Sequence, residues 1–126
     1  MDFKLELVPL PVADVDRAVA FYADRMGFVV DLDVRNGDTF RVVQLTPPGS
    51  GCSVAVGIGV VSTAPGSVQG LHLVVVDIHA AVAELRGRGV VVADVIDMTA
   101  PGKPTVSYAA FTDPDGNGWT LQQIGV

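Results

Sequence analysis

Histidine, the side chain that most readily exchanges a proton near neutral pH, occurs only twice in these 126 residues. His72 stands in LHLVVVD, and His79 follows Asp77 at the start of a helical pattern. His72 is the candidate for general acid–base catalysis, because a group that titrates near neutrality suits that role best. The alternative is a structural histidine that is hydrogen-bonded inside a β core. We expect His79 to be a solvated surface residue.

The other side chains that could act in catalysis do not occur at spacings that indicate an active site. Cys52 is the only cysteine, which excludes an intrachain disulfide and a cysteine-based zinc site within one chain. No His or Lys lies near it in GSGCSVAVG, so we expect a structural thiol. Ser53, Ser107 and Thr120 show no pairing in sequence with a His and an acid that would indicate a nucleophile. The GSG and GNG pieces precede strand patterns, which argues against phosphate binding at a helix start.

Composition limits the class of protein. Hydrophobic residues make up 49% and charged residues 17%, a balance typical of an ordered domain, and 126 residues fit a single one. The net charge of −6 argues against nucleic acid and anionic membrane surfaces as partners. The start, MDFKLELVPL, lacks the basic and continuously apolar segments of a signal peptide, and no later apolar run is long enough to span a bilayer. We therefore expect a cytoplasmic protein.

An internal repeat organises the chain. The segment PVADVDRAVAFY (11–22) aligns with VVVDIHAAVAEL (74–85) at an offset of 63 residues, the difference between Asp77 and Asp14. Each Asp is a good N-cap, because its side chain accepts from backbone N–H groups of the first helical turn. The apolar residues that follow recur at helical spacing, which predicts one amphipathic helix in each copy.

Valine-rich strand patterns follow each predicted helix, separated by turn signals rich in Gly, Pro, Asn and Asp. The predicted strands are 28–34, 39–45 and 53–60 in the first copy and 90–96, 105–111 and 118–124 in the second. With a short strand before each helix, the pattern predicts an α+β fold of two βαβββ repeats. The first repeat spans about 1–62 and the second about 68–126. The turn DPDGN (113–117) joins the last two strands, and we expect its role to be structural.

This chain resembles the vicinal oxygen chelate superfamily, which contains glyoxalases, bleomycin-resistance proteins and extradiol dioxygenases. The residues that carry the resemblance are VPLPVADVDRAVAFYADRMGF (8–28), its repeat LHLVVVDIHAAVAELRGRGV (71–90) and FTDPDGNGWTLQQ (111–123). The resemblance implies a single glyoxalase-like domain over 1–126, whose four-stranded half-barrels pair around a cavity with the helices outside. It also implies that two chains often form this cavity together. Valine-rich strand edges should be covered, so we expect a homodimer.

In metal-using members of the superfamily, ligands drawn from His, Glu and Gln stand at equivalent points of both repeats. By the resemblance, the corresponding positions here are Leu7 and Gly70 on the first strands, and Thr120 and Val54 on the last strands. These residue types do not build a divalent-metal site. Glu6 is the nearest carboxylate, one residue away and therefore on the opposite strand face. We expect no metal and no cofactor.

Strand alternation indicates which side chains line the implied cavity. From Gly70 it places His72 on the cavity face, and from Thr120 it places Gln122 there. Arg41 and Tyr108 are anchors for an anionic or aromatic ligand if they face inward, a point that the sequence leaves open. The predicted ligand-binding set is His72, Gln122, Tyr108, Arg41, Thr120, Val54 and Leu7.

The favoured hypothesis is a metal-independent protein that binds a small hydrophobic or aromatic ligand in an apolar cavity, with antibiotic sequestration as a role that the resemblance implies. The alternative is a metal-free isomerase, cyclase or lyase with His72 as acid or base and Gln122 or Tyr108 holding the developing oxyanion. A second alternative is a metal-dependent glyoxalase-like lyase or dioxygenase, which requires a shifted register and brings Glu6 forward as a ligand.

Overall fold

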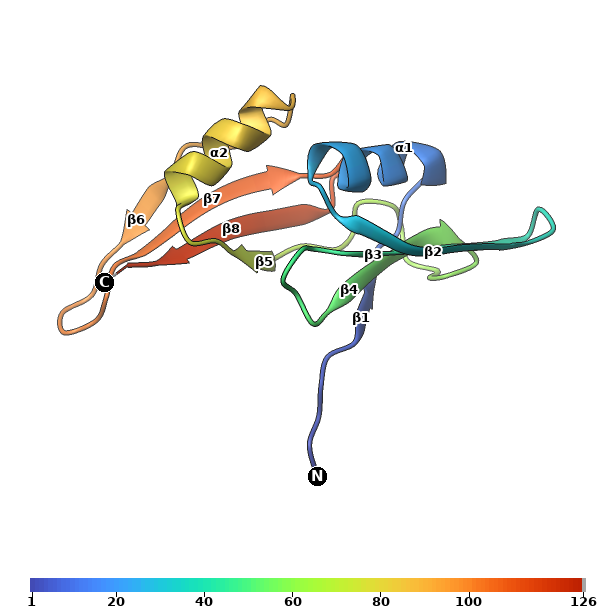
Figure 1. Ribbon diagram of the computed structural model, residues 1–126, viewed down its shortest axis with the longest axis horizontal. Coiled ribbons are helices and arrows are strands. Elements are labelled where there is room, and N and C mark those ends of the chain that lie inside the picture. The colour runs from blue at the N-terminus through green and yellow to red at the C-terminus, as the bar shows by residue number, and fades with distance from the viewer. Residues whose placement is uncertain (126) are drawn as a thin grey trace. The chain divides into compact units, whose positions relative to one another are not determined.

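The computed structural model describes residues 1–125, which fall into two compact units (Figure 1). The first unit consists of Met1–Val68 together with the short segment Pro114–Asn117. The second consists of Gln69–Asp113 and the chain from Gly118 onward.

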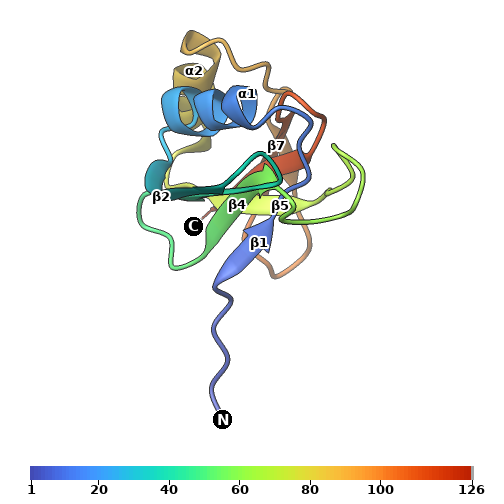
Figure 2. The ribbon, with the colours of Figure 1, turned by 90° about the vertical axis from the view of Figure 1, so that its right-hand side faces the viewer.

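The first unit holds one four-stranded sheet and one helical stretch. Its elements are β1 (Leu7–Pro9), α1 (Val15–Val19), the π-helix η1 (Ala20–Arg25), β2 (Val29–Asn36), β3 (Phe40–Thr46) and β4 (Ser53–Ile58). The strand order is β1-β4-β3-β2, with β1 parallel to β4 and the other pairs antiparallel. The helical stretch contacts β4 and covers one face of the sheet (Figure 2).

The second unit repeats this topology. Its elements are β5 (Leu71–Val74), α2 (Ile78–Gly87), β6 (Ile96–Met98), β7 (Val106–Thr112) and β8 (Gly118–Ile124). The strand order is β5-β8-β7-β6, again with only the first strand in a parallel pair. Since both units run strand, helix, three strands, the predicted α+β fold of two βαβββ repeats is confirmed.

Both predicted helix caps are present. The side chain of Asp14 accepts from the backbone N–H of Arg17 at 3.1 Å, and that of Asp77 accepts from Ala80 at 3.1 Å. The first helix differs from the expected single α-helix, because it continues as a π-helix after Val19. This wider segment buries the adjacent rings of Phe21 and Tyr22 together.

The core of each unit lies between the helix and one sheet face. In the second unit, α2 contacts β7 and β8 through the buried side chains of Ile78, Val82 and Leu85. The sheet side chains that face it alternate along the two strands, as expected when only one face is buried. They are Ala109 and Phe111 on β7 and Trp119 and Leu121 on β8.

One predicted strand was placed wrongly. The pattern VVVADVI predicted a strand over 90–96, but β6 begins only at Ile96, and Val92 forms an isolated bridge with Phe111. The guanidinium of Arg86 donates to the carbonyl of Val92 at 2.7 Å, so that carbonyl bonds to a side chain. Val92 is also buried, which explains its apolar character without a continuous strand.

The turn between β7 and β8 bonds to the first unit, to which Pro114–Asn117 belongs. Asp115 accepts from the backbone N–H of Ala13 and from the guanidinium of Arg17, both at 3.0 Å. The fully buried Asn117 accepts from the N–H of Val68 at 3.1 Å and donates to the carbonyl of Pro11 at 2.9 Å. The turn therefore holds both ends of the first repeat.

A candidate ligand-binding face in the second repeat

The strand register brings four of the predicted site residues to one side of the second sheet. The paired residues are His72 with Thr120, Val74 with Gln122, Tyr108 with Gln122, and Ala110 with Thr120. Residues that pair directly across strands share a face, so these side chains lie opposite the face that packs on α2. We call this side the open face; it carries His72, Val74, Ile96, Met98, Tyr108, Ala110, Thr120 and Gln122.

His72 is held by two neighbours on the open face. Its Nδ1 lies 2.8 Å from Oε1 of Gln122, and its ring meets the ring of Tyr108 edge-on, with centroids 5.9 Å apart. An amide oxygen only accepts hydrogen bonds, so Nδ1 is the donor in this contact, and in the neutral imidazole Nε2 is then an acceptor. The arrangement fixes the imidazole in one orientation beside an aromatic ring and an amide.

A hollow of about 450 Å³ lies in the open face. Apolar and aromatic side chains from β6 and β7 form much of its wall, and polar groups come from His72 and Thr120. Asp94 stands at its margin, where it forms an ion pair with Arg86 at 3.1 Å. A mostly apolar concavity with a few polar groups is the usual character of a small-molecule site.

Large apolar side chains on the open face are exposed in this chain. Ile96 is 58% exposed and Met98 is 57% exposed, and Val74 and Ile124 on the same side are also open to solvent. Single exposed apolar residues are ordinary, but a contiguous group of them usually marks a surface that binds something. The face therefore has the character of a binding surface.

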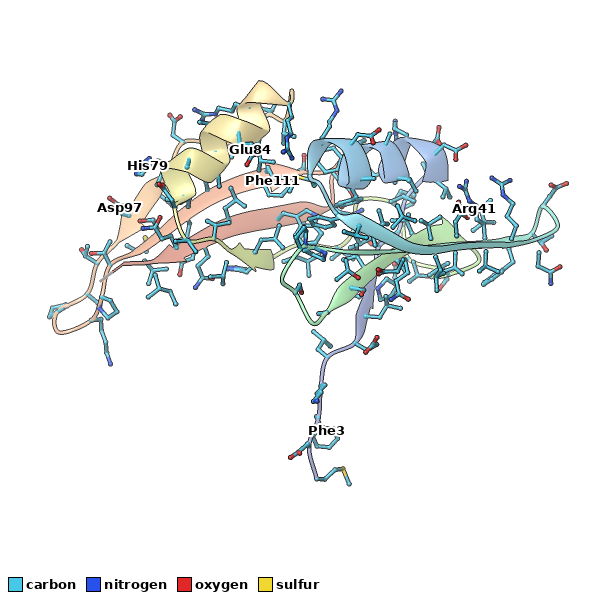
Figure 3. The ribbon with its side chains drawn as sticks, viewed as in Figure 1. Phe3, Arg41, His79, Glu84, Asp97 and Phe111 are labelled. Carbon is cyan, nitrogen blue, oxygen red and sulfur yellow. The ribbon has the colours of Figure 1, made fainter. Side chains whose placement is uncertain are left out.

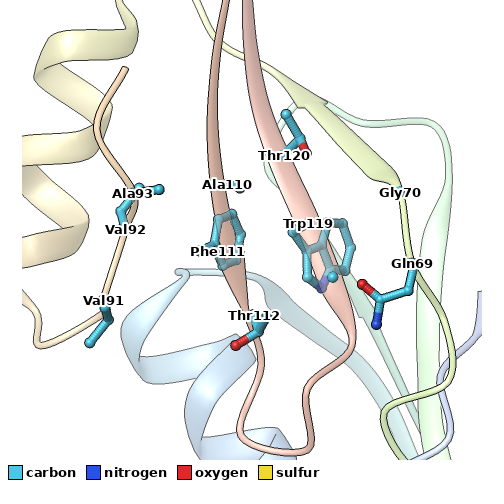
Figure 4. Close-up of a pocket in the computed structure, with 11 residues that line it drawn as sticks. Gln69, Gly70, Val91, Val92, Ala93, Ala110, Phe111, Thr112, Trp119 and Thr120 are labelled. Atoms are coloured by element: carbon cyan, nitrogen blue, oxygen red, sulfur yellow. The ribbon is translucent and has the colours of Figure 1, made fainter. Parts of the chain in front are cut away.

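A second hollow, of about 440 Å³, adjoins the first and shares Ala93, Ala110 and Thr120 with it. Figure 4 shows its lining, in which Phe111 and Trp119 stand side by side on β7 and β8. Their rings are nearly parallel, 6.2 Å apart. The two hollows meet at Ala93, Ala110 and Thr120, whereas Phe111 and Trp119 belong to the face that packs on α2.

Arg41 does not lie on an open face. Figure 3 labels Arg41 on the first unit. Its guanidinium bonds to Asp16 of α1 at 2.7 Å and to both carboxylate oxygens of Asp33 on β2, at 3.0 and 2.8 Å. These bonds raise the pKa of Arg41, and the hydrogen bond from Arg41 lowers the pKa of Asp33. Arg41 is only 8% exposed, so it faces the helix of the first repeat and holds β2 and α1 together.

The two apolar positions of the predicted set lie on opposite faces of the first sheet. Leu7 pairs with Ser53 and faces away from the helix, whereas Val54 pairs with Leu45 and is buried on the helix side. The prediction that Val54 lies on the cavity face is therefore wrong, because its side chain lies on the helix side of the sheet. Leu45 pairs with Val54 in the first repeat, and Phe111 pairs with Trp119 in the second. Eight residues separate the first pair and seven separate the second, so Val54 corresponds to Trp119. The counterpart of Thr120 is therefore Ala55.

A polar cluster on the first sheet is absent from the predicted set. Thr46 bonds to Asp31 and lies 2.7 Å from the hydroxyl oxygen of Ser53, which also accepts from the amide of Gln44 at 3.3 Å. The only sequence signal for it is that Gln44 and Thr46 alternate with apolar residues. Ile96 and Met98 were also missed, because the predicted strand ended where β6 begins.

The donor set on the open face does not fit a divalent metal. Its nitrogen and oxygen donors are one imidazole, one amide and hydroxyl groups, and a catalytic site needs about three ligands of the His, Asp, Glu or Cys type. Within residues 1–125 no three His, Cys, Asp or Glu side chains gather to hold a metal ion. Metal independence stays a prediction. No helix in the same residues has the length and apolar character to cross a membrane.

Comparisons with known proteins place the chain in a family. The family model for the Glyoxalase/Bleomycin resistance protein/Dioxygenase superfamily matches residues 4–121. The chain belongs to this superfamily, which confirms the resemblance seen in its motifs. A search of curated proteins finds no match.

Several solved structures are similar to this chain over nearly its whole length. TnmS3, an antibiotic binding protein from Streptomyces sp. CB03234, is 32% identical, with 98% of each chain covered and a TM-score of 0.81. A glyoxalase/bleomycin resistance protein from the same organism is 33% identical over 95% of this chain and 100% of that one, with a TM-score of 0.76. A superfamily member from Sphaerobacter thermophilus DSM 20745 is 28% identical over 97% and 98%, with a TM-score of 0.80.

Proposed function

We propose that this protein binds a small hydrophobic or aromatic molecule on the open face of its second repeat, without a metal ion. The observation that carries the proposal is the exposed apolar surface around a fixed pair of polar side chains, His72 and Gln122. The proposal includes the homodimer and the cytoplasmic location that the sequence predicts. The predicted pairing of half-barrels around the ligand stays a prediction.

The side chains of the open face indicate the chemistry of the ligand. Ile96, Met98 and the Tyr108 ring offer apolar contact, which favours a flat or aromatic body. The amide N–H of Gln122 and the hydroxyl of Thr120 can donate to a ligand carbonyl, and Nε2 of a neutral His72 can accept from a ligand hydroxyl. Among the described residues that line the main hollow, Asp94 is the one carboxylate, and the chain carries a net charge of −6, so a neutral or weakly cationic ligand is favoured over an anion.

The superfamily model and the similarity to an antibiotic binding protein support this proposal. Sequestration of an antibiotic requires binding and no chemical step, which agrees with a face on which, within residues 1–125, His72 bonds to the amide of Gln122 and to no hydroxyl or thiol. We therefore propose sequestration of a small apolar natural product as the role.

The test is a calorimetric titration of chelator-treated protein with bleomycin and, separately, with the neutral apolar dye Nile red. Ile96→Asp puts a charge into the apolar wall and is expected to weaken binding at least tenfold, because the carboxylate loses water when the ligand docks. Val76→Asp is the matched control, since Val76 is exposed in the loop before α2 and lies outside both hollows. If the two variants bind both probes equally well, the open face is not the site.

Native mass spectrometry of the purified protein gives an independent measurement. A retained organic molecule, present in the wild type and lost in Ile96→Asp, would support the open face as the site and its mass would indicate the ligand. A metal ion at one per chain that disappears with a chelator, together with the bound molecule, would contradict metal independence.

The His72 geometry favours one alternative, a metal-free isomerase, cyclase or lyase. Nδ1 is engaged by Gln122, which in the neutral imidazole leaves Nε2 as the atom that could take a proton from a molecule in the hollow, while Tyr108 lies beside the ring. His72→Ala separates the two proposals. A binding protein loses affinity modestly, whereas an enzyme loses about a hundredfold or more in the rate at which the retained molecule is converted.

A further inference from the structure

Four polar side chains gather on the first sheet, on the face that α1 does not cover. They are Asp31 on β2, Gln44 and Thr46 on β3, and Ser53 on β4, and we call them the Asp31 cluster. Gln44 and Thr46 alternate with Leu45, which is buried on the helix side, so their side chains point to the other side. All contacts of the cluster lie within the first unit.

A β-bulge brings Asp31 into the cluster. β2 pairs with β3 at Val30 and again at Leu32, and the register shifts between these two residues. Asp31 is therefore the extra residue of the bulge, and it reaches the face of Thr46 together with Leu32. A bulge re-aims a side chain, and bulges are frequent beside functional sites. The strand thus loses a regular pair at the position of the carboxylate.

Hydrogen bonds run through the cluster in one direction. The side-chain amide of Gln44 donates to the hydroxyl oxygen of Ser53 at 3.3 Å, and that oxygen lies 2.7 Å from Oγ1 of Thr46. Thr46 in turn donates to Oδ2 of Asp31. An ionised carboxylate only accepts, so Thr46 uses its single hydroxyl proton on Asp31, and Ser53 must donate to Thr46. Every hydroxyl proton in the cluster therefore points toward Asp31.

The carboxylate end of the cluster is left with acceptors and a negative charge. Both hydroxyl protons are used internally, so Ser53 and Thr46 can only accept from a further molecule. Within residues 1–125, Asp31 forms no ion pair with a Lys, Arg or His side chain, and its Oδ1 receives no hydrogen bond. The complement of such a site is a group that carries a positive charge and donates hydrogen bonds.

Aliphatic side chains flank the cluster on the same face. The residues that pair directly with cluster members across the strands include Leu7 on β1 and Val29 and Leu32 on β2. Directly paired residues share a face, so a molecule held at the carboxylate would lie against apolar side chains. This favours an amine on a carbon chain over a metal ion, for which no three His, Cys, Asp or Glu side chains gather within residues 1–125.

We propose that the Asp31 cluster binds the protonated amine of a small aliphatic molecule. The ammonium group donates to Oδ1 of Asp31 and to the hydroxyl oxygens of Thr46 and Ser53, and its carbon chain lies along the flanking aliphatic side chains. The hydroxyl chain has a positioning role, because it orients the carboxylate before the amine arrives. This site is separate from the open face of the second repeat and does not rest on the proposed function.

NMR titration of the wild-type protein at neutral pH with hexylamine, hexanol and heptanoate tests both charge and location. The three probes share one carbon chain and differ only in the head group. We expect hexylamine to shift backbone resonances of β2, β3 and β4, and hexanol to bind at least about tenfold more weakly, because a charged donor makes the stronger hydrogen bond. Heptanoate should cause no shift there. Equal affinities for amine and alcohol, or no shift in the first sheet, would overturn the proposal.

Asp31→Asn removes the charge and keeps an oxygen that accepts from Thr46. We expect its Kd for hexylamine to rise at least about tenfold while its NMR spectrum stays that of a folded protein. Asp38→Asn is the matched control, because it makes the same change of charge in the exposed turn before β3, and its Kd should stay within about twofold. An Asp31→Asn protein that binds hexylamine as tightly as the wild type refutes the site.

A second pair of variants tests the hydroxyl chain. Thr46→Val keeps the carboxylate of Asp31 and removes the bond that orients it, so the Kd for hexylamine should rise about fivefold. Thr46→Ser restores the hydroxyl and should return the Kd to within about twofold of the wild type, which a loss of packing alone would not produce. Equal affinities of Thr46→Val and the wild type, or no rescue by serine, would overturn the positioning role.

Discussion

Replacement of Asn117 by alanine should destabilise the protein more than any substitution of an exposed asparagine. The amide of Asn117 is 0% exposed, accepts from the N–H of Val68 and donates to the carbonyl of Pro11. An alanine leaves both backbone groups without this partner. A buried polar group that loses its partner costs about 1–3 kcal/mol, and the half-buried Val68 group lies at the low end of that range. We expect a loss of about 3 kcal/mol in the free energy of unfolding.

Urea unfolding followed by circular dichroism measures this loss. With a denaturant slope of about 2 kcal/mol per molar, a loss of 3 kcal/mol lowers the midpoint by about 1.5 M. Asn36→Ala is the matched control, because Asn36 is exposed at the end of β2 and its loss should cost less than about 0.5 kcal/mol. A midpoint for Asn117→Ala within about 0.3 M of the control would refute the argument that this amide holds the first unit together.

Three further substitutions test the packing and electrostatics. Arg41 lowers the pKa of Asp33 below its ordinary 3.8, so the stabilisation is present above the unfolded-state pKa and is lost as the pH falls through the folded value. The urea midpoint of the wild type should therefore fall more steeply below about pH 4 than that of Arg41→Gln, and parallel pH profiles would contradict this. Gly57→Ala should cost about 2 kcal/mol in urea unfolding, because a Cβ there would overlap the carbonyl of Arg41; an unchanged midpoint would count against the tight approach. Asp77→Ala removes the cap of α2 and should cost about 1 kcal/mol by the same measurement, with Asp38→Ala, in the exposed turn before β3, as the control.

Local signals made the fold predictable from the sequence. An N-capping Asp followed by a helical apolar stripe depends on neighbouring residues only, so Asp14 and Asp77 located both helices and, through their offset, the repeat. The strand registers then follow from the topology that the repeat implies. For the same reason, alternation along a single strand correctly placed His72 on the same face as Thr120.

Features that depend on loop length or on burial of both faces were less predictable. The fixed residue offset between the repeats assigned Val54 to the wrong face of the first sheet. One extra loop residue before a strand reverses which of its residues face each side. The orientation of Arg41 stayed open because β3 carries apolar residues on both of its faces. Val92 shows a further source of error, because it is apolar and buried but forms only an isolated bridge and no continuous strand.

The position of Pro114–Asn117 in the first unit sets an order of events during synthesis. The chain of the first repeat ends at Val68, but Asn117, which bonds Pro11 and Val68, is added 49 residues later (117 − 68). At about 5–20 residues per second, the first repeat waits roughly 2–10 seconds for this residue. The first repeat is therefore completed only when the second is nearly made, so the two halves reach their native state together rather than one after the other.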